Sequence, residues 1–228
     1  MRTEIVVDKE HHHRVLSRIG LARVEVWIAT ATLKALFAEA PIGSVARARG
    51  RWVSIVDTLR ELVGRGVDVR ILHGAPPSAP FARALEKGGP RLAMRHCPRV
   101  HLKMIAIDGE ALYLGSANLT GAGLGAKQEG RRNFEMGILT SDERALERAQ
   151  GRYDAIWRGK ECGGCKLRKV CPAPLDGVAA PLAASRARQR AADGGQRTAD
   201  RGRRGGKPAA NSRQRAASTP ARRAPRRG

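Results

Sequence analysis

Hydrophobic and polar positions alternate with a period of two along much of this chain, and between those stretches the period lengthens to that of a helix. Val24, Val26 and Ile28 are separated by charged or amphipathic residues, which predicts a half-buried strand. By the same criteria, strands are predicted at 4–7, 67–72 and 133–139, and helices at 9–20, 30–38, 52–63 and 81–87. Strands that alternate with helices in this way predict an α/β domain, a mixed β-sheet flanked by helices.

Turn and capping residues mark the ends of these elements. The helix that begins at Trp52 is predicted to end at Gly64 or Gly66, and residues 41–51, rich in glycine and arginine, are predicted to form a loop. Thr140-x-x-Glu143 matches a capping box and predicts the start of a last helix. The apolar face of that helix consists of Leu146, Ala149, Tyr153 and Ile156.

A β-hairpin is predicted over residues 101–118, HLKMIAIDGEALYLGSAN. Two apolar runs flank Asp108-Gly109, and Asp-Gly is the strongest short hairpin signal because glycine tolerates a positive φ. Asp108 is therefore interpreted as a turn residue with a structural role.

The ends of this hairpin carry polar side chains. Since side chains alternate along a strand, His101 and Lys103 share one face, and so do Ser116 and Asn118. A nucleophile, a cation and two hydrogen-bond donors can thus converge on one small anion. Phosphate is the obvious candidate.

The pattern H-x-K-x4-D followed by G-S-x-N resembles the signature of the phospholipase D superfamily. The resemblance implies one phospholipase D-like lobe over residues 1–160. It also implies a phosphohistidine formed by His101, charge stabilisation by Lys103, Ser116 and Asn118, and no metal in catalysis. Asp108 belongs to the family motif, but its opposite parity to His101 keeps its interpretation structural.

Two features after the hairpin extend this site. Family members carry a glutamate on a strand after G-S-x-N that orients the catalytic histidine, and the resemblance assigns this role to Glu135. The glycine-rich loop before it contains Lys127, Arg131 and Arg132, which suit a phosphate backbone. Solvated loop charge is an equally good interpretation of these three residues.

Family chemistry needs a second histidine, which protonates the leaving group, whereas this sequence contains one motif. A homodimer with the site on its twofold axis is the simplest solution, because each subunit then supplies one His101. The run His11-His12-His13 is interpreted as solvated or cap-proximal, since consecutive helical residues point in different directions. At most two of the three could share a metal ion without other ligands.

Three of the four cysteines form a C-x2-C-x5-C cluster, which predicts a metal-binding knuckle at residues 161–176. The cluster consists of Cys162, Cys165 and Cys171, and Cys97 is a candidate fourth ligand. Zinc is the common occupant of four-thiolate sites. The spacing is also similar to that of iron–sulfur DNA-processing nucleases, so a structural iron–sulfur cluster is an alternative, as are three reduced thiols without metal.

The net charge of +22 is concentrated near the end of the sequence. Residues 179–228 hold 14 of the 43 Lys and Arg residues and only two of the 21 Asp and Glu residues. High charge with little apolar surface predicts a disordered Arg-rich tail over residues 177–228. Such tails bind polyanions, nucleic acid first and acidic membranes second, or serve only solubility.

No apolar run reaches the length of a membrane span, and the start lacks the features of a secretory signal, so a cytoplasmic protein is expected. Together these patterns favour a metal-independent endonuclease acting on DNA. A phospholipase D or phosphatidyl transferase acting on lipid head groups is the enzymatic alternative. A DNA-binding module with a vestigial site is a third interpretation, disfavoured by the intact motif.

Overall fold

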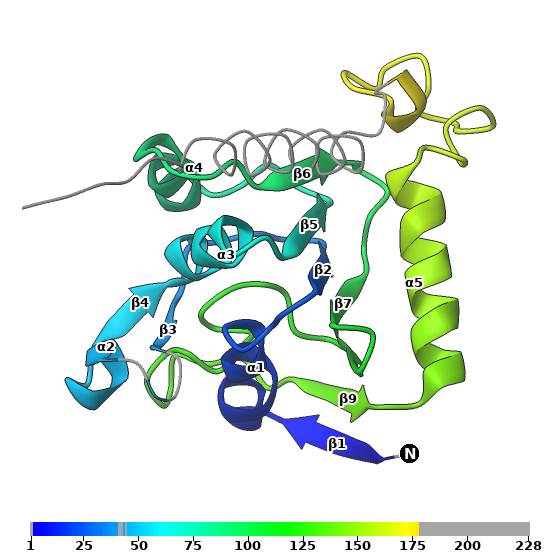
Figure 1. Cartoon of the computed structure of the whole chain (residues 1–228). Helices are drawn as coiled ribbons and strands as arrows, with labels where there is room; N and C mark the ends of the chain where they lie inside the picture. Colours follow the sequence, from blue (N-terminus) through cyan, green and yellow to red (C-terminus); the bar gives the residue numbers. More distant parts are fainter. Residues whose placement is uncertain (1, 41–42, 44, 178–228) are drawn as a thin grey trace, which may run out of the picture. The chain divides into compact units, whose positions relative to one another are not determined.

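The computed structural model describes residues 2–40, 43 and 45–177 (Figure 1). It confirms the α/β class, because a seven-stranded mixed sheet in the order β1-β9-β8-β7-β2-β5-β6 is flanked by helices. The strands are β1 (Thr3–Val7), β2 (Glu25–Thr30), β5 (Asp68–His73), β6 (Ala93–His96), β7 (Lys103–Ile107), β8 (Ala111–Gly115) and β9 (Met136–Thr140). Strands β2, β5 and β6 pair in parallel, and all other pairs of this sheet are antiparallel.

Helices cover the two faces of the sheet unequally. One face packs on η1 (His11–Leu16), α1 (Ser17–Ile19), α3 (Ile55–Gly64) and α4 (Ala79–Glu86), whereas α5 (Glu143–Trp157) packs on the other (Figure 1). Each face therefore has its own apolar cluster. The remaining elements are β3 (Phe37–Glu39), α2 (Val45–Ala48), β4 (Trp52–Ser54) and η2 (Leu175–Gly177).

The helix predicted at 30–38 is wrong. Strand β2 continues to Thr30, whose hydroxyl donates to the Thr32 carbonyl at 2.8 Å and accepts from the Leu119 N–H at 3.0 Å. The N–H of Lys34 donates to the Leu119 carbonyl at 3.0 Å. Tertiary partners thus bind the groups that a helix would pair internally, and a β-branched Thr at two positions disfavours the helix further.

Two further predictions differ from the structure. The helix expected from Trp52 begins at Ile55, where the Ser54 hydroxyl caps it by accepting from the Val56 N–H at 3.3 Å. The loop at 41–51 contains the one-turn helix α2.

The predicted capping box at Thr140 is wrong. Asp142 is the N-cap of α5, because its carboxylate accepts from the Ala145 N–H at 2.8 Å. The Thr140 hydroxyl instead accepts from the Asp142 N–H at 3.1 Å and so shapes the turn before the cap. An ionised carboxylate is the better acceptor at a helix N-terminus.

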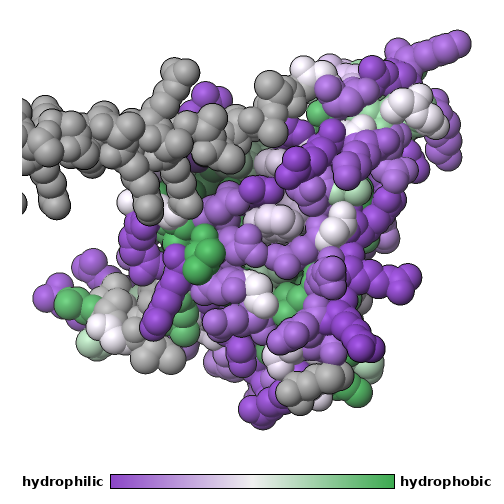
Figure 2. Space-filling view, turned by 45° about the vertical axis from the view of Figure 1, so that its right-hand side comes forward, coloured by the Kyte–Doolittle hydropathy of each residue, from purple (hydrophilic) through white to green (hydrophobic). Residues whose placement is uncertain are grey.

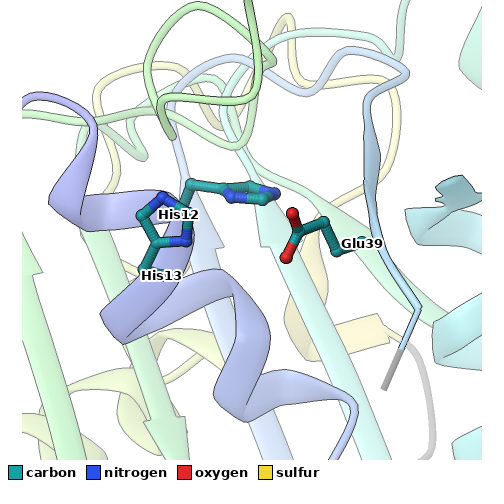
Figure 3. A group of neighbouring side chains, drawn as sticks. All are labelled: His12, His13 and Glu39. Carbon is teal, nitrogen blue, oxygen red and sulfur yellow. The ribbon is translucent and has the colours of Figure 1, made fainter. Parts of the chain in front are cut away.

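The histidine run is less solvated than predicted, because His11 and His12 are buried and only His13 is exposed. The first turns form a π-helix, in which His12 stacks on Trp52 with ring centroids 5.4 Å apart. His12, His13 and Glu39 converge (Figure 3), and their ligand atoms lie within 4.8 Å of one another. Glu39, however, already pairs with a cation, Arg47.

The predicted tail falls, from residue 178 onward, outside the described residues. The boundary at residue 160 between the catalytic domain and the cysteine knuckle stays a prediction.

Candidate functional site

The hairpin turn has the conformation that Asp-Gly favours. Asp108 and Gly109 have φ of +56° and +68°. The Asp108 carboxylate accepts the backbone N–H groups of Arg23, Val24 and Glu25 at 2.8–3.1 Å. Asp108 thus ties the turn to the start of β2, which gives it the structural role expected from its parity.

At the other end of β7, the His101 ring and Lys103 ammonium are in contact. Lys103 Nζ lies 3.2 Å from each ring nitrogen of His101 and 3.1 Å from the His101 carbonyl oxygen. An ammonium group only donates, so the ring nitrogen that it meets carries a lone pair. The exposed imidazole therefore lies directly beside a positive charge.

Asn118 is fixed through its side-chain oxygen. This oxygen accepts from the Thr32 N–H at 3.1 Å and lies 3.3 Å from the oxygen of the buried Thr30 hydroxyl, whose proton goes to the Thr32 carbonyl. The amide NH2 is the remaining polar group of Asn118, and it can only donate. Because Thr30 is the register partner of Lys103, this donor lies at the end of the sheet that carries the histidine.

Ser116 and Glu135 form a second polar group. The Ser116 hydroxyl donates to one Glu135 oxygen, and Asn133 donates to the other at 3.0 Å. Glu135 lies directly before β9, and its N–H donates to the Asp8 carboxylate at 3.1 Å. Among the described residues, the partner of the His101 ring is Lys103 rather than Glu135, so the orienting role of Glu135 stays a prediction.

Gly115, the glycine of the G-S-x-N motif, has a packing role. A Cβ atom there would lie 2.3 Å from the Tyr113 hydroxyl oxygen and 2.8 Å from the Cα of Gly137 on β9. The Tyr113 hydroxyl accepts from the Ala117 N–H at 3.3 Å, and burial raises the pKa of this phenol to about 12. A neutral tyrosine thus supports the backbone that presents Ser116.

A cavity of about 520 Å³ opens beside His101 and Lys103. Across it lie two exposed arginines of α5, Arg148 and Arg152, and Arg152 pairs with Glu161 at 2.6 Å. Sequence reasoning missed both arginines. Their i,i+4 spacing beside the small residues Ala145 and Ala149 was the available signal.

The three basic loop residues are not among the described residues that line this cavity. Lys127 and Arg131 are exposed, and Arg132 is half-buried with an Nε that has no hydrogen-bond partner among the described residues. Their assignment to substrate stays a prediction. The surface that is turned forward in Figure 2 is mostly hydrophilic.

Two other histidines lie on the same cross-strand row as Lys103. His73 pairs in register with Thr30 and with His96, and the two rings stack with centroids 5.3 Å apart. Backbone carbonyls hold them, His73 through Ala75 at 2.9 Å and His96 through Gly74 at 3.1 Å. Burial lowers the pKa of His73.

All four cysteines line a second, small cavity of about 20 Å³. Cys97 lies on the connection from β6 to β7, and the other three follow α5. Hydrogen bonds from the Leu167 backbone and from Arg99 lower the pKa of the Cys165 thiol. The structure therefore brings Cys97 to the same cavity as the other three cysteines, and their role as metal ligands stays a prediction.

The sequence of this domain matches a known protein family. Residues 15–157 match the family described as cardiolipin synthase, PLD-like domain. The chain belongs to this PLD-like family. Over 97 residues, the chain is 35% identical to cardiolipin synthase A of Pseudomonas putida (strain W619), covering 39% of this chain. It spans 19% of the length of that relative.

Two solved structures have a similar backbone fold. NucT from Helicobacter pylori is 18% identical with a TM-score of 0.46, covering 67% of this chain and 93% of its own. Nuc from Salmonella typhimurium, a phospholipase D family member, is 19% identical with a TM-score of 0.47, covering 69% and 94%. Among the described residues, no helix combines the length and apolar character that crossing a membrane requires.

Proposed function

We propose that this PLD-like phosphodiesterase cleaves DNA through a phosphohistidine on His101, in an active site shared by two subunits. The contact between the His101 ring and the Lys103 ammonium is the single observation that carries the proposal. It places a nucleophilic lone pair beside the charge that a phosphodiester needs. The proposal further specifies DNA as the substrate and a dimer as the active assembly.

The chemistry proceeds in two displacements. A His101 ring nitrogen attacks phosphorus, and the bond to the leaving oxygen breaks while a second histidine protonates that oxygen. Water then attacks the phosphohistidine, gives its proton to the second histidine, and frees His101. Lys103 and the amide of Asn118 stabilise negative charge on the non-bridging oxygens in both steps. Because this charge is met by an ammonium group and hydrogen-bond donors, we expect no metal requirement for catalysis.

The second histidine is proposed to be His101 of the second subunit. Within the chain, His73 and His96 are the histidines on the same row, and a carbonyl oxygen holds each ring through one nitrogen, Nδ1 of His73 and Nε2 of His96. A proton shuttle must face the leaving group, and neither of these two residues is among the described residues that line the cavity beside His101. A twofold axis beside His101 supplies one without any further residue.

An apolar surface next to the site suits such a dimer. Ile5 pairs across the sheet with Ile138, and Val7 with Met136, and all four side chains are exposed. Phe134, beside Glu135, is 97% exposed. Contiguous apolar surface of this kind marks an interaction site, and a second copy that covers it would lie directly against Ser116 and Glu135.

Charge favours DNA as the substrate. The net charge of +22 suits a polyanion, and Arg148 and Arg152 line the cavity beside His101 at a spacing of one helical turn. Successive phosphates of one strand could therefore contact the site and α5 together. The similarity to cardiolipin synthase A favours the second candidate, phosphatidyl transfer between lipid head groups.

The test is one preparation of the chain, assayed with excess chelator on supercoiled plasmid and on phosphatidylglycerol vesicles in parallel. We expect nicking of the plasmid, abolished by His101→Ala and retained by His13→Ala, which removes an exposed histidine elsewhere. Activity on vesicles alone would establish the lipid candidate. Rapid loss of activity in chelator, restored by magnesium, would contradict the phosphohistidine mechanism.

A further inference from the structure

The four cysteines are remote in sequence but share one cavity, and the proposed phosphodiesterase chemistry uses none of them. Cys97 reaches the cavity from the connection between β6 and β7, while Cys162, Cys165 and Cys171 reach it from the segment after α5. Each is partly buried, and none forms a disulfide. Four thiols that line one cavity are the ligand type that a soft metal centre requires. Within the part of the chain that the structure describes, no three of these sulfurs lie within 4.8 Å of one another, so they are spaced more widely than the ligands of a single ion.

The segment that follows α5 turns tightly at the cysteines. The Cys165 N–H donates to the Cys162 carbonyl at 3.2 Å, and the Arg168 N–H donates to the Cys165 carbonyl at 2.9 Å. Gly163 and Gly164 lie within the first turn, and a Cβ added at either would have no atom within 4 Å. These turns keep the segment compact, and Cys162, Cys165 and Cys171 all line the cavity.

Apolar packing does little to hold this segment. Between residues 158 and 177, only Gly159 and Leu175 are buried, and η2 is the only regular element. Arg95 anchors the segment by donating to the carbonyls of Trp157 and Leu175. Ordering each residue costs backbone conformational entropy, so a mostly exposed segment needs another source of stability. Metal ligation supplies it in small cysteine-rich modules.

Charge around the cavity also suits such a centre. Arg99 and Arg168 line it, and Arg99 hydrogen-bonds the Cys165 sulfur. Four thiolates around a zinc ion carry a net charge of about −2, which Arg99 offsets in part, while Arg168 is already paired with Asp176.

We propose that Cys97, Cys162, Cys165 and Cys171 hold one metal centre through four thiolates, separate from the phosphodiesterase site. The occupant is a thiophilic metal group, either a single zinc ion or an iron–sulfur cluster. The wide spacing of the sulfurs favours a cluster of several metal atoms, because a single ion would require the four sulfurs to move closer together.

The position of the centre gives it a consequence for the active site. Cys97 precedes His101 by four residues, and its N–H donates to the His73 carbonyl at 2.9 Å. The centre would thus join the end of α5 to the segment that leads into His101. It holds the catalytic histidine in place without contacting substrate.

The experiment measures metal in the full chain, purified without added metal under anaerobic conditions. Mass spectrometry of the elements should find about one zinc per chain, or about four irons with acid-labile sulfide and a brown absorption near 400 nm. Either result supports the centre and identifies its occupant. A chain that carries less than about a tenth of an equivalent of every metal would overturn it.

Substitutions then assign the ligands. Cys165→Ser should reduce bound metal at least fivefold and lower the melting temperature, whereas Lys169→Ser, an exposed control inside the same knuckle, should change neither. Metal that persists in all four single Cys→Ser variants would reveal an adventitious ion and overturn the proposal.

The wild type provides a measurement that does not depend on the variants folding. Native thiols should react slowly with a thiol reagent and release metal as they do. Four thiols that react at once in the folded, metal-loaded chain would overturn the assignment.

Discussion

At Asp108 and His101, two polar residues of one motif do different work because they lie at opposite ends of β7. Both carboxylate oxygens of Asp108 accept backbone N–H groups at the start of β2. His101 is exposed, and the ammonium of Lys103 is the hydrogen-bond partner of its ring within the part of the chain that the structure describes. A strand places one residue at the turn and the other at the open end of the sheet.

Substitution should separate these two roles. Asp108→Ala removes three charge-assisted hydrogen bonds and places alanine at a positive φ, so the free energy of unfolding should fall by about 2–4 kcal/mol. Phosphodiester turnover by the folded fraction should change by less than about threefold. His101→Ala should leave stability unchanged within about 0.5 kcal/mol and abolish turnover. Urea denaturation and a rate assay on both variants measure the contrast, and an inactive but stable Asp108→Ala would contradict it.

Acid should destabilise the chain through buried His12. Burial, and next the neighbouring His13, lower the pKa of His12 from its ordinary value near 6.5. Above pH 6.5 the ring is neutral in both states, so stability is complete. As the pH falls below 6.5, the unfolded chain binds the proton first, and stability declines until the lowered pKa is passed.

The measurement is urea denaturation between pH 7.5 and 5.5. His12→Phe keeps an aromatic ring on Trp52 and removes the titrating nitrogens, so its decline should be shallower than that of the wild type. Buried His73 still contributes to the remaining slope. Identical slopes in both proteins would show that His12 does not couple folding to protonation.

At the scale of elements, sequence predicted best where a short-range rule and the tertiary structure agree. The β7–β8 hairpin, its Asp-Gly turn and the polar residues at its ends follow from a period of two and one turn signal. The segment 30–38 failed because Leu119, a residue far along the chain, binds its backbone groups. Arg148 escaped notice since its relevance depends on α5 lying across the cavity from His101.

Gly115 of the G-S-x-N motif lies where β8 and β9 pack closely together. Alanine there would bring a Cβ within 2.3 Å of the Tyr113 hydroxyl, so β8 and β9 must separate or the ring must move. We expect Gly115→Ala to destabilise the chain by about 1–3 kcal/mol and to lower turnover at saturating substrate, because Ser116 shifts with the strand. Thermal unfolding and kcat measure the two effects.

Gly151 provides the matched control on α5. Nothing lies within 4 Å of a Cβ at Gly151, and alanine favours the helix interior by roughly 1 kcal/mol over glycine. Gly151→Ala should therefore stabilise the chain slightly and leave turnover unchanged. If both substitutions destabilise equally, close packing at Gly115 is not the cause.

At the scale of the whole molecule, one motif and one apolar surface point to the same assembly. The motif supplies one His101 where two-step chemistry needs two histidines. The surface formed by Ile5, Val7, Met136 and Ile138 lies on the edge strand β1 and its neighbour β9, next to Ser116. A subunit that covers this surface would complete the site at the same time.

Mixing wild type with His101→Ala under subunit exchange tests that assembly. If each site needs His101 from both subunits, heterodimers are inactive, and only the wild-type dimers remain active. Equal amounts leave about a quarter of the dimers fully wild type, so activity per dimer should fall to about a quarter of that of pure wild type. Sites confined to single chains would leave about half, because each wild-type subunit would keep its activity in any dimer. The control is a mixture of wild type with His13→Ala, which should keep full activity and so show that subunit exchange itself causes no loss. A Met136→Ser variant, which places a polar hydroxyl in the apolar surface, should lower both dimer content and turnover, and both should recover together at high protein concentration. A value near one half, or turnover by a strictly monomeric chain, would place the second proton donor within the chain and return attention to His73 and His96.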